Sequence, residues 1–452
     1  MESILESVLR RLRPSEREIM RAREIFEELK KELEPYFRDV NASIQLHGSV
    51  EKGTAISGEL DLDIFVLIPS ELGKEWIRKE FIRRAGKALE RYNPEERYAE
   101  HPYLRVKFSE GFEADIVPGL RISDPRMSVT AVDRTPFHTE LIKKIFDEKM
   151  RDEVRLLKRF MKGVGVYGAE VRVGGFSGYL AELLIARFKS FLSVLENASR
   201  WRGRVVLSLE ESEDPRILKK LFPDAALIYP DPVDPRRNAA AAVRRDTLAR
   251  FILASKLFLE EPSEYFFYPS SIPPDIIKRV LKERCTIVAE LKLLHKDSPD
   301  NIWGQLLRIK RRCFNTLNGE GYEPHYIDVL WNERDNPILF VELPLEYCFK
   351  DYILRVVEGP YADNEESSNF IRKRIAFGEG FWIREGRLYG YRKRSRKDLM
   401  DKIRDLVNTG GVSLNRFVDS EELIKDLGED YIIQLGEAVL KIPRFLFHKL
   451  VV

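Results

Sequence analysis

The sequence predicts a multidomain α+β protein, and three observations support this fold class. The chain has 452 residues, which is more than one hydrophobic core usually organises. Its first third alternates short stretches of strand periodicity with amphipathic helical stretches, and its middle third is helical almost throughout. The last third returns to strands mixed with helices. We therefore expect three regions: residues 1–140 with a small mixed sheet, residues 141–262 mostly helical, and residues 263–452 as an α+β part.

The elements of the first region follow from capping and periodicity. A helix begins at Ser15, where Ser15 and Glu18 form a capping box, and its apolar residues recur at helical spacing until Pro35. Several further elements are predicted, of which the last two strands form a hairpin. They are strands near residues 42–46, 60–68, 97–101, 104–108 and 112–117, a short helix at 50–55, and a longer helix at about 74–91.

The later elements are read in the same way. Helical periodicity covers Leu141–Lys162, Gly178–Glu196 and Asp246–Leu259, and a polar, proline-rich passage lies before the third of these stretches. Prolines between residues 262 and 274 mark a boundary. Beyond it we expect helices at residues 275–283 and 301–318, and strands at 285–294 and 338–343.

Composition excludes some classes of protein and leaves others open. The hydrophobic fraction of 44% suffices for globular cores, and no apolar run approaches the length of a membrane span. The acidic start of the chain is unlike a signal peptide, so we expect a soluble, cytoplasmic protein that does not contact membranes. Cys285, Cys313 and Cys348 are widely spaced, and we expect reduced thiols and no zinc site. A net charge of +2 does not by itself indicate a nucleic-acid binder.

Two acidic residues share one face of the strand at residues 60–68. Alternation puts Asp61 and Asp63 on one side, roughly 6.5 Å apart along the backbone. From there both carboxylates can reach two metal ions about 3.5–4 Å apart, and carboxylates and phosphates together favour Mg²⁺. Asp115, in the strand at 112–117, adds a third carboxylate.

A Gly-Ser turn precedes these acids. Gly48 permits a tight turn and a close approach of phosphate to the backbone, while Ser49 can donate its hydroxyl beside the start of a short helix. An Asp-x-Asp motif alone is weak, because surface segments often carry one. Together with the Gly-Ser turn and Asp115, it predicts a nucleotidyl-transfer site.

These motifs resemble the signature of the polymerase-β-like nucleotidyltransferases. Further stretches between about residues 43 and 255 narrow the resemblance to the archaeal, class I, CCA-adding tRNA nucleotidyltransferases. They lie at residues 100–103, 131–138, 153–158, 167–170, 175–180 and 231–234, the last followed by Arg237-Asn238. The resemblance implies a catalytic palm at 1–140, a helical neck at 141–262, and a C-terminal, tRNA-binding body and tail at 263–452.

The resemblance also implies an activity. It is the template-independent addition of C, C and A to the 3′ end of tRNA from CTP and ATP, with two Mg²⁺ ions and release of pyrophosphate. Asp61, Asp63 and Asp115 would be the catalytic metal ligands, and the protein would bind the acceptor stem and top half of tRNA. Two alternatives stay open: a poly(A) or oligo(U) polymerase built on the same catalytic unit, and a catalytically silent RNA-binding protein.

The resemblance assigns the nucleotide-binding residues as well. Arg237 would read the base of CTP or ATP, because a guanidinium offers donors in a fixed fork, although the adjacent Arg236 leaves the choice between the two arginines open. By this resemblance, Lys52 stands where many family members carry arginine. His47 and His101 have no metal-ligand spacing with His138. The nucleotide-binding set implied by the resemblance is Gly48, Ser49, Lys52, His138, Lys158, Tyr167 and Arg237.

A basic, aromatic segment is the candidate RNA surface. Residues Ile371–Arg404 contain twelve Lys or Arg and four acids. Basic side chains neutralise phosphates and aromatic rings stack on bases; the alternative is a solvated face with core aromatics, and the resemblance favours RNA. The sequence leaves open whether the protein forms a homodimer. The aromatic residues of the segment are Phe377, Phe381, Trp382, Tyr389 and Tyr391.

Overall fold

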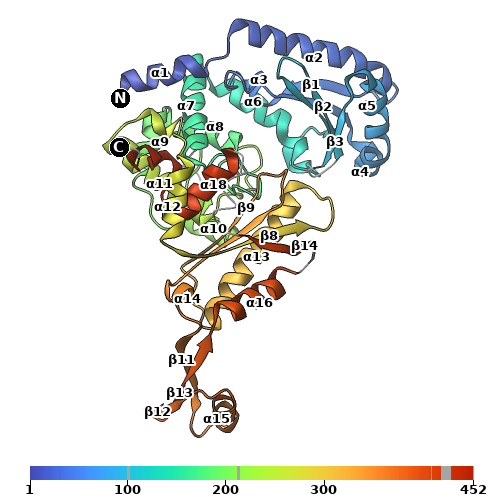
Figure 1. Cartoon of the computed structure of the whole chain (residues 1–452). Coiled ribbons are helices and arrows are strands. Elements are labelled where there is room, and N and C mark those ends of the chain that lie inside the picture. Colours follow the sequence, from blue (N-terminus) through green and yellow to red (C-terminus); the bar gives the residue numbers. More distant parts are fainter. Residues whose placement is uncertain (99–101, 211–213, 409, 419–428, 451–452) are drawn as a thin grey trace. The chain divides into compact units, whose positions relative to one another are not determined.

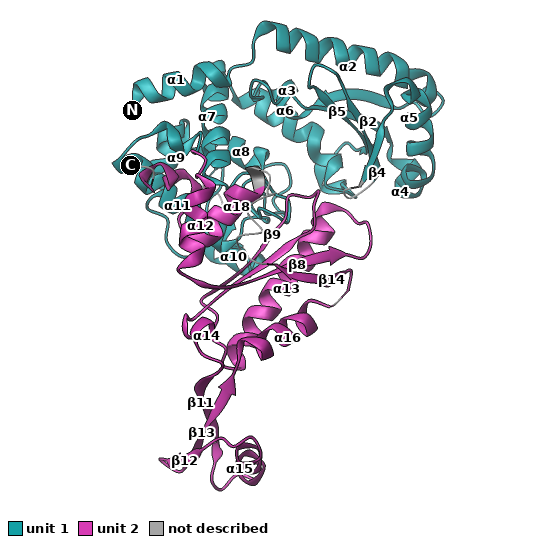
Figure 2. Cartoon of the chain, viewed as in Figure 1, with its two compact units in different colours: residues 1–269 teal, residues 270–452 magenta. Residues whose placement is uncertain are grey.

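The computed structural model describes residues 1–98, 102–210, 214–408, 410–418 and 429–450. The chain forms two compact units, Met1–Pro269 and Ser270–Val452 (Figures 1 and 2). Residues 99–101, predicted as the end of a strand, and His101 among them, lie outside the described residues. The α+β fold class is confirmed, whereas the division of the chain at residues 140 and 262 stays a prediction.

A five-stranded mixed sheet organises the first part of unit 1. Its strand order is β1-β2-β5-β4-β3, in which β2 and β5 are parallel and the other neighbours are antiparallel. The predicted hairpin is present as β4 and β5. The strands are β1 Ser43–His47, β2 Leu62–Pro69, β3 Glu95–Tyr98, β4 Pro102–Lys107 and β5 Glu113–Arg121.

One face of β2 is buried beneath helices. Helix α2 (Glu16–Phe37) begins at the predicted capping box and continues past Pro35. Its apolar side joins that of α5 (Ile82–Ala88) and the alternate apolar residues of β2 in one core. Because alternate residues of a strand point to opposite faces, Asp63 lies on the face away from this core. The smaller helices here are α1 Glu2–Leu12, α3 Gly48–Lys52, α4 Gly73–Trp76, a π-turn at Ile77–Phe81 and 3₁₀ turns at Ser70–Leu72, Glu90–Tyr92, Pro125–Met127 and Val132–Arg134.

The first stretch predicted as one helix, Leu141–Lys162, is two helices. They are α6 (Thr135–Ile145) and α7 (Glu148–Val164), and Asp147 caps the second by accepting a hydrogen bond from the Met150 amide. Hydrophobic periodicity misses such a break, because a local side-chain cap decides it.

The second stretch, Gly178–Glu196, is also broken. It forms α8 (Gly178–Phe188) and α9 (Phe191–Ala198), since Lys189 adopts a φ of +71° and Ser190 caps α9. The third prediction is confirmed as α11 (Arg245–Glu260). Short elements complete this part: β6 Val205–Val206, α10 Pro215–Leu221, β7 Leu227–Ile228 and a 3₁₀ turn at Glu264–Phe266.

Unit 2 contains a four-stranded antiparallel sheet in the order β14-β8-β10-β9. The predicted helices at 275–283 and 301–318 and the predicted strands at 285–294 and 338–343 are confirmed. The strands are β8 Cys285–Leu293, β9 Tyr326–Leu330, β10 Ile338–Leu343 and β14 Val412–Val418. The helices are α12 Pro274–Lys282, α13 Pro299–Gly319, α14 Glu346–Phe349, α16 Arg396–Val407, α18 Glu429–Leu440 and a 3₁₀ segment at Arg444–Leu450.

The basic, aromatic segment belongs to a second, three-stranded sheet of unit 2. This sheet has the order β11-β13-β12 and carries α15 (Figure 1). Phe377 is 68% exposed, whereas Arg374 is buried and paired with Glu379. The segment therefore mixes open surface with structural ion pairs. Its elements are β11 Ile353–Tyr361, α15 Ser367–Ala376, β12 Phe381–Arg384 and β13 Arg387–Arg394.

The expectation of three free thiols is wrong. Cys285 and Cys348, which are 63 residues apart in sequence, form a disulfide, and Cys313 is a buried free thiol. Spacing in the sequence could not reveal this pair, because the fold of unit 2 brings β8 next to α14. Among the helices within the described ranges, none is long and apolar enough to cross a membrane.

Candidate active site

Three neighbouring strands align His47, Asp63 and Asp115 in one row across the sheet. In the strand register, Asp63 lies opposite His47 on β1 and opposite Asp115 on β5. Paired positions point to the same face of a sheet. The row therefore places two of the three predicted metal ligands on adjacent strands.

Asp63 in this row and Asp61 beside it resist ionisation. Burial, and then the negative charge of Asp115, raises the pKa of Asp63 to about 6. Asp61 lies just before the first residue of β2 and is exposed at the residue level, and desolvation together with Glu113 raises its pKa as well. Acidic groups that repel one another are stabilised by a bound cation, so this donor set fits a hard divalent metal ion.

Arg105 holds the third predicted ligand. Its Nε and Nη2 donate to the two carboxylate oxygens of Asp115, each at 2.7 Å, and its Nη1 lies 2.9 Å from Glu113. Among the residues described, no three His, Cys, Asp or Glu side chains form a ready metal site. Both carboxylate oxygens of Asp115 are therefore engaged by Arg105 in this arrangement. Alternation along residues 104–108 could have shown that Arg105 shares the face of Asp115.

Gly48 brings the backbone directly against the acidic row. Its φ of +69° favours glycine, and a Cβ there would lie only 1.7 Å from Oδ2 of Asp63. Glycine is therefore required by both conformation and space. Ser49 follows it in α3 and is half-buried.

His47 has a structural environment. Its Nδ1 lies 3.1 Å from the Thr139 hydroxyl and its Nε2 lies 3.1 Å from Oε1 of Gln45. Burial lowers its pKa to about 4, so the ring is neutral near neutral pH. With both ring nitrogens engaged, the imidazole does not bind a metal in this arrangement.

Lys52 and Lys158 converge on one buried carboxylate that sequence reasoning missed. Nζ of Lys52 donates to Oε2 of Glu182 at 2.8 Å, and Nζ of Lys158 lies 3.5 Å from Oε1. The Thr54 hydroxyl donates to the same carboxylate at 2.7 Å and lies 3.0 Å from Nζ of Lys158. The signal in the sequence is a single acid within the apolar run Tyr179–Ile185.

The charges of this cluster depend on one another. Burial lowers the pKa of Lys158 to about 8, against the attraction of Glu182. Burial acts to raise the pKa of Glu182, but Lys52 and Lys158 outweigh it and lower the pKa overall. Two ammonium groups and one carboxylate therefore leave one net positive charge in a buried position.

The Tyr167 hydroxyl lies beside this cluster, close to Gly178 at the start of α8. A Cβ on Gly178 would lie 2.9 Å from the Tyr167 hydroxyl and 3.8 Å from Nζ of Lys158. Burial raises the pKa of Tyr167, which therefore keeps its proton. Gly178 permits this close packing, and Ser177 caps the helix.

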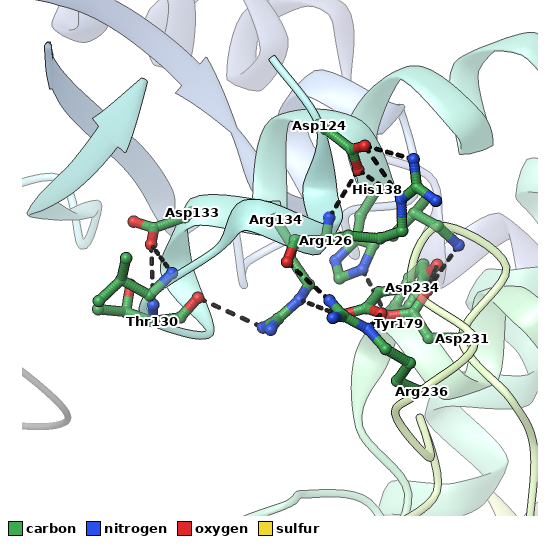
Figure 3. A network of polar contacts seen from close by, with 12 residues as sticks. Asp124, Arg126, Thr130, Asp133, Arg134, His138, Tyr179, Asp231, Asp234 and Arg236 are labelled. Atoms are coloured by element: carbon green, nitrogen blue, oxygen red, sulfur yellow. Dashed lines mark hydrogen bonds and ion pairs between the residues drawn. The ribbon is translucent and has the colours of Figure 1, made fainter. Parts of the chain in front are cut away.

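His138 is held by two residues of the helical part. Its Nε2 lies 2.8 Å from Oδ2 of Asp231, and its ring stacks on Tyr179 with centroids 3.9 Å apart. The Tyr179 hydroxyl donates to the other oxygen of Asp231 at 3.0 Å. Figure 3 shows these side chains pointing toward one another.

Arg236 and Arg237 have different environments. Arg236 donates to Oδ1 of Asp234 at 2.8 Å and to the Arg126 carbonyl at 2.7 Å (Figure 3). Arg237 is exposed, and in the part of the chain that the structure describes its guanidinium makes no hydrogen bond or ion pair. The arginine predicted to read the base is thus the one whose donors are available to a ligand.

Three protein-family models match successive parts of the chain. They are a nucleotidyltransferase domain at residues 21–138, the second domain of tRNA nucleotidyltransferase at 152–268, and the C-terminal domain of the CCA-adding enzyme at 284–433. The matches cover most of the chain and fall on both units.

Full-length relatives agree with these matches. A CCA-adding enzyme from Sulfurisphaera tokodaii is 41% identical, with 87% of this chain and 89% of that protein aligned. A CCA-adding enzyme from Sulfolobus acidocaldarius is 38% identical, with 88% of this chain and 89% of that protein aligned. One from Saccharolobus solfataricus is 36% identical, with 87% of this chain and 90% of that protein aligned. The resemblance predicted from the motifs is confirmed: this chain belongs to the family of CCA-adding enzymes, the tRNA nucleotidyltransferases of the archaeal class I.

Proposed function

We propose that this chain completes the 3′ end of tRNA by adding C, C and A from CTP and ATP, without a template and with release of pyrophosphate. The observation that carries the proposal is the sequence match through the nucleotidyltransferase, second and C-terminal domains together. Asp63 and Asp115 lie opposite each other on β2 and β5, and this pair of carboxylates supports the proposal that the chain is an active transferase. A silent binding protein would have no need of repelling carboxylates held in register.

Two Mg²⁺ ions are the metals we propose for this site. Asp61 and Asp63 would hold both ions, and Asp115, once turned from Arg105, would join them beside the attacking hydroxyl. When bound, such ions supply Lewis-acid stabilisation to the attacking 3′ oxygen and to the leaving pyrophosphate. Arg105 pairs with Asp115, which limits the repulsion within the row.

The nucleoside triphosphate would lie between the sheet and the helical part. Gly48 and Ser49 offer a backbone that approaches closely and a hydroxyl, and Tyr167 offers a phenolic proton. Lys52 and Lys158 would contribute the net positive charge of their cluster with Glu182. A triphosphate carries more negative charge and more acceptor oxygens than one carboxylate. It can therefore accept hydrogen bonds from the ammonium groups of Lys52 and Lys158, which Glu182 holds in place.

His138 and Arg237 would contact the nucleoside. Asp231 fixes the imidazole of His138, and Arg237 presents its fork of donors without a protein partner among the described residues. The acceptor edges of cytosine and adenine can accept from such a fork.

Unit 2 would bind the acceptor stem and top half of tRNA, and the exposed rings of its three-stranded sheet support this role. We propose the cytoplasm as the place of action, since immature tRNA is the substrate. A homodimer stays a prediction that sedimentation of the free protein would check.

The test uses purified protein, Mg²⁺ and tRNA transcripts that end before CCA, at CC and at CCA. Each nucleotide is supplied singly and together, and products are resolved to one nucleotide. We expect CTP to extend the first transcript by two residues, ATP to extend the second by one, and the third to stay unchanged. Long homopolymer tails on any RNA would point to a poly(A) or oligo(U) polymerase, and no incorporation at all would favour the binding protein.

A further inference from the structure

The segment from Asp231 to Asn238, here named the arginine loop, is a closed hairpin. The Asp231 amide donates to the Arg237 carbonyl at 2.9 Å, and the Arg237 amide donates to the Asp234 carbonyl at 2.9 Å. The Asn238 side chain accepts from the Tyr229 amide at 2.8 Å and donates to the Leu227 carbonyl at 2.9 Å. These bonds leave the loop backbone little freedom.

Two buried aspartates of the arginine loop contact residues outside it. Asp231 is 4% exposed and Asp234 is 1% exposed. Asp231 binds His138, and Asp234 binds the buried Arg134 through Nε at 3.2 Å. Both partners follow β5 in the chain, so the loop is fixed to the sheet part of unit 1 by two separate buried contacts.

Arg134 is itself connected to β5 through Asp133 and Thr130. Its neighbour Asp133 accepts from the Leu120 amide on β5 at 2.9 Å and from the Thr130 amide at 2.8 Å. Arg134 also donates to the Thr130 carbonyl at 3.3 Å. A continuous set of buried bonds therefore runs from Leu120 on β5, the strand of Asp115, to Asp234. Figure 3 shows the part of this set from Asp133 and Thr130 through Arg134 to Asp234.

Asp234 also decides which arginine is available. It holds Arg236 through Nε, while the second arm of Arg236 reaches the Arg126 carbonyl. Arg237, next in the chain, has its backbone bound to the Asp234 carbonyl and its side chain exposed. The Asp234 carboxylate thus engages the guanidinium of Arg236, and the Asp234 backbone carbonyl holds the amide of Arg237.

We propose that Asp234 is a positioning residue for nucleotide selection. It joins the arginine loop to β5 through Arg134 and keeps Arg236 from competing, so that Arg237 meets the base at a set position relative to the catalytic carboxylates. This inference rests on the proposed function, since it assigns the choice of C and A over U and G to the same site.

Selectivity is the readout that separates positioning from a merely structural role. General loss of stability lowers the rate with every nucleotide, whereas a displaced Arg237 changes the ratio between nucleotides. The measurement is kcat/KM for CTP and for UTP on a tRNA transcript lacking CCA, with full-length protein and Mg²⁺. The variants are Asp234→Asn, Arg134→Lys and Arg237→Ala, and the matched control is Arg236→Ala.

We expect Asp234→Asn to lower the ratio of kcat/KM for CTP to kcat/KM for UTP by about tenfold or more, the effect of losing one hydrogen bond from a charged group. Arg237→Ala should lower it at least as much, and Arg236→Ala should leave it within about twofold. Arg134→Lys keeps the charge but loses the fork, so it should give a smaller decrease, and it provides the test if Asp234→Asn does not fold.

An unchanged ratio in folded Asp234→Asn would overturn the inference, and so would an equal loss in Arg236→Ala, which would make Arg236 the reader. Wild-type protein that adds neither C nor A would instead contradict the proposed function. Circular dichroism and thermal melting of each variant establish that the proteins compared are folded.

Discussion

The two units of this protein hold their charged residues in opposite ways. In unit 1 the charges around the predicted site are buried and shared: Lys52, Lys158 and Glu182 are each 6% exposed or less. In unit 2 the basic and aromatic segment is largely open, with Phe377 68% exposed and Arg384 74% exposed at its side chain.

The difference matches the size of the expected ligands. A triphosphate is small, and a few charges that a buried site already holds close together can bind it specifically. A tRNA is a large hydrated polyanion, and exposed cations and rings can adapt to it at little cost in desolvation. The comparison therefore predicts large, specific losses from changes in unit 1 and small, graded losses from changes in unit 2.

The largest effect should come from the acidic row. Asp63→Asn keeps the shape of the side chain but removes the charge, and we expect the rate of CTP incorporation to fall by about 10⁴-fold. Binding of tRNA, measured by filter retention, should stay roughly unchanged. Glu110→Gln, an exposed acid on the hairpin of the same sheet, is the control. Full activity in Asp63→Asn would remove the metal assignment.

The buried lysine cluster comes next. Glu182→Gln leaves Lys52 and Lys158 without their shared anion, and we expect the KM for CTP and ATP to rise about 10- to 100-fold, as for the loss of a charge-assisted hydrogen bond of about 1.5–3 kcal/mol. The KM for tRNA should not change. Glu196→Gln, exposed on α9, is the control. Lost stability with normal KM values would mean that the lysines serve only as counterions of Glu182.

Removing the Cys285–Cys348 disulfide tests what stabilises unit 2. Cys348→Ser should lower the free energy of unfolding by about 2–4 kcal/mol, because the bond closes a long loop, with 63 residues of separation. Denaturant titration measures this. Reductant should lower the stability of the wild type to that of Cys348→Ser and should leave the variant unaffected. Equal stability of the oxidised and reduced wild type would speak against the bond.

The raised pKa of Asp63 predicts a smaller effect that depends on pH. The folded state binds this proton more tightly than the unfolded chain, with a pKa of about 6 against 3.8. The contribution of Asp63 to the free energy of unfolding is therefore fully present below about pH 4 and is lost as the pH rises through about 6. We expect a loss of about 1–2 kcal/mol for a side chain still partly in contact with solvent.

Bound Mg²⁺ should reverse that loss. The rise in Tm on adding Mg²⁺ should be larger at pH 7.5 than at pH 5, and Asp63→Asn should flatten the difference. A rise in Tm that is the same at both pH values in the wild type would contradict this account of the acidic row.

The smallest effect is expected at the open sheet of unit 2. Trp382 is half-buried and stacks on Tyr389 with centroids 5.8 Å apart. Trp382→Ala should weaken tRNA binding by about fivefold, the lower end of what one aromatic contact contributes, with no change in the KM for CTP. Phe314→Ala, an exposed ring on α13, is the control, and an equal loss there would show that the sheet has no special role.

Much of the architecture could be predicted from local patterns. Strand alternation placed Asp63 opposite the buried face of β2, and the capping box at Ser15 placed the start of α2. The four elements predicted in unit 2 agree with α12, β8, α13 and β10 to within a few residues, while its other helices and strands were not predicted. Helix breaks at Asp147 and Lys189 were missed, because a cap or one left-handed residue interrupts a helix without disturbing its hydrophobic period.

The sequence by itself determined the fold class, the family and the identity of the chemical groups, because these depend on periodicity and on short motifs. Only the tertiary structure decided which charged side chains pair with one another. The pairs of Arg105 with Asp115, of Glu182 with two lysines, and of Asp234 with Arg134 each join residues from different parts of the fold. Burial and charge act through space, so the strength of such pairs is set by distances that no local pattern contains.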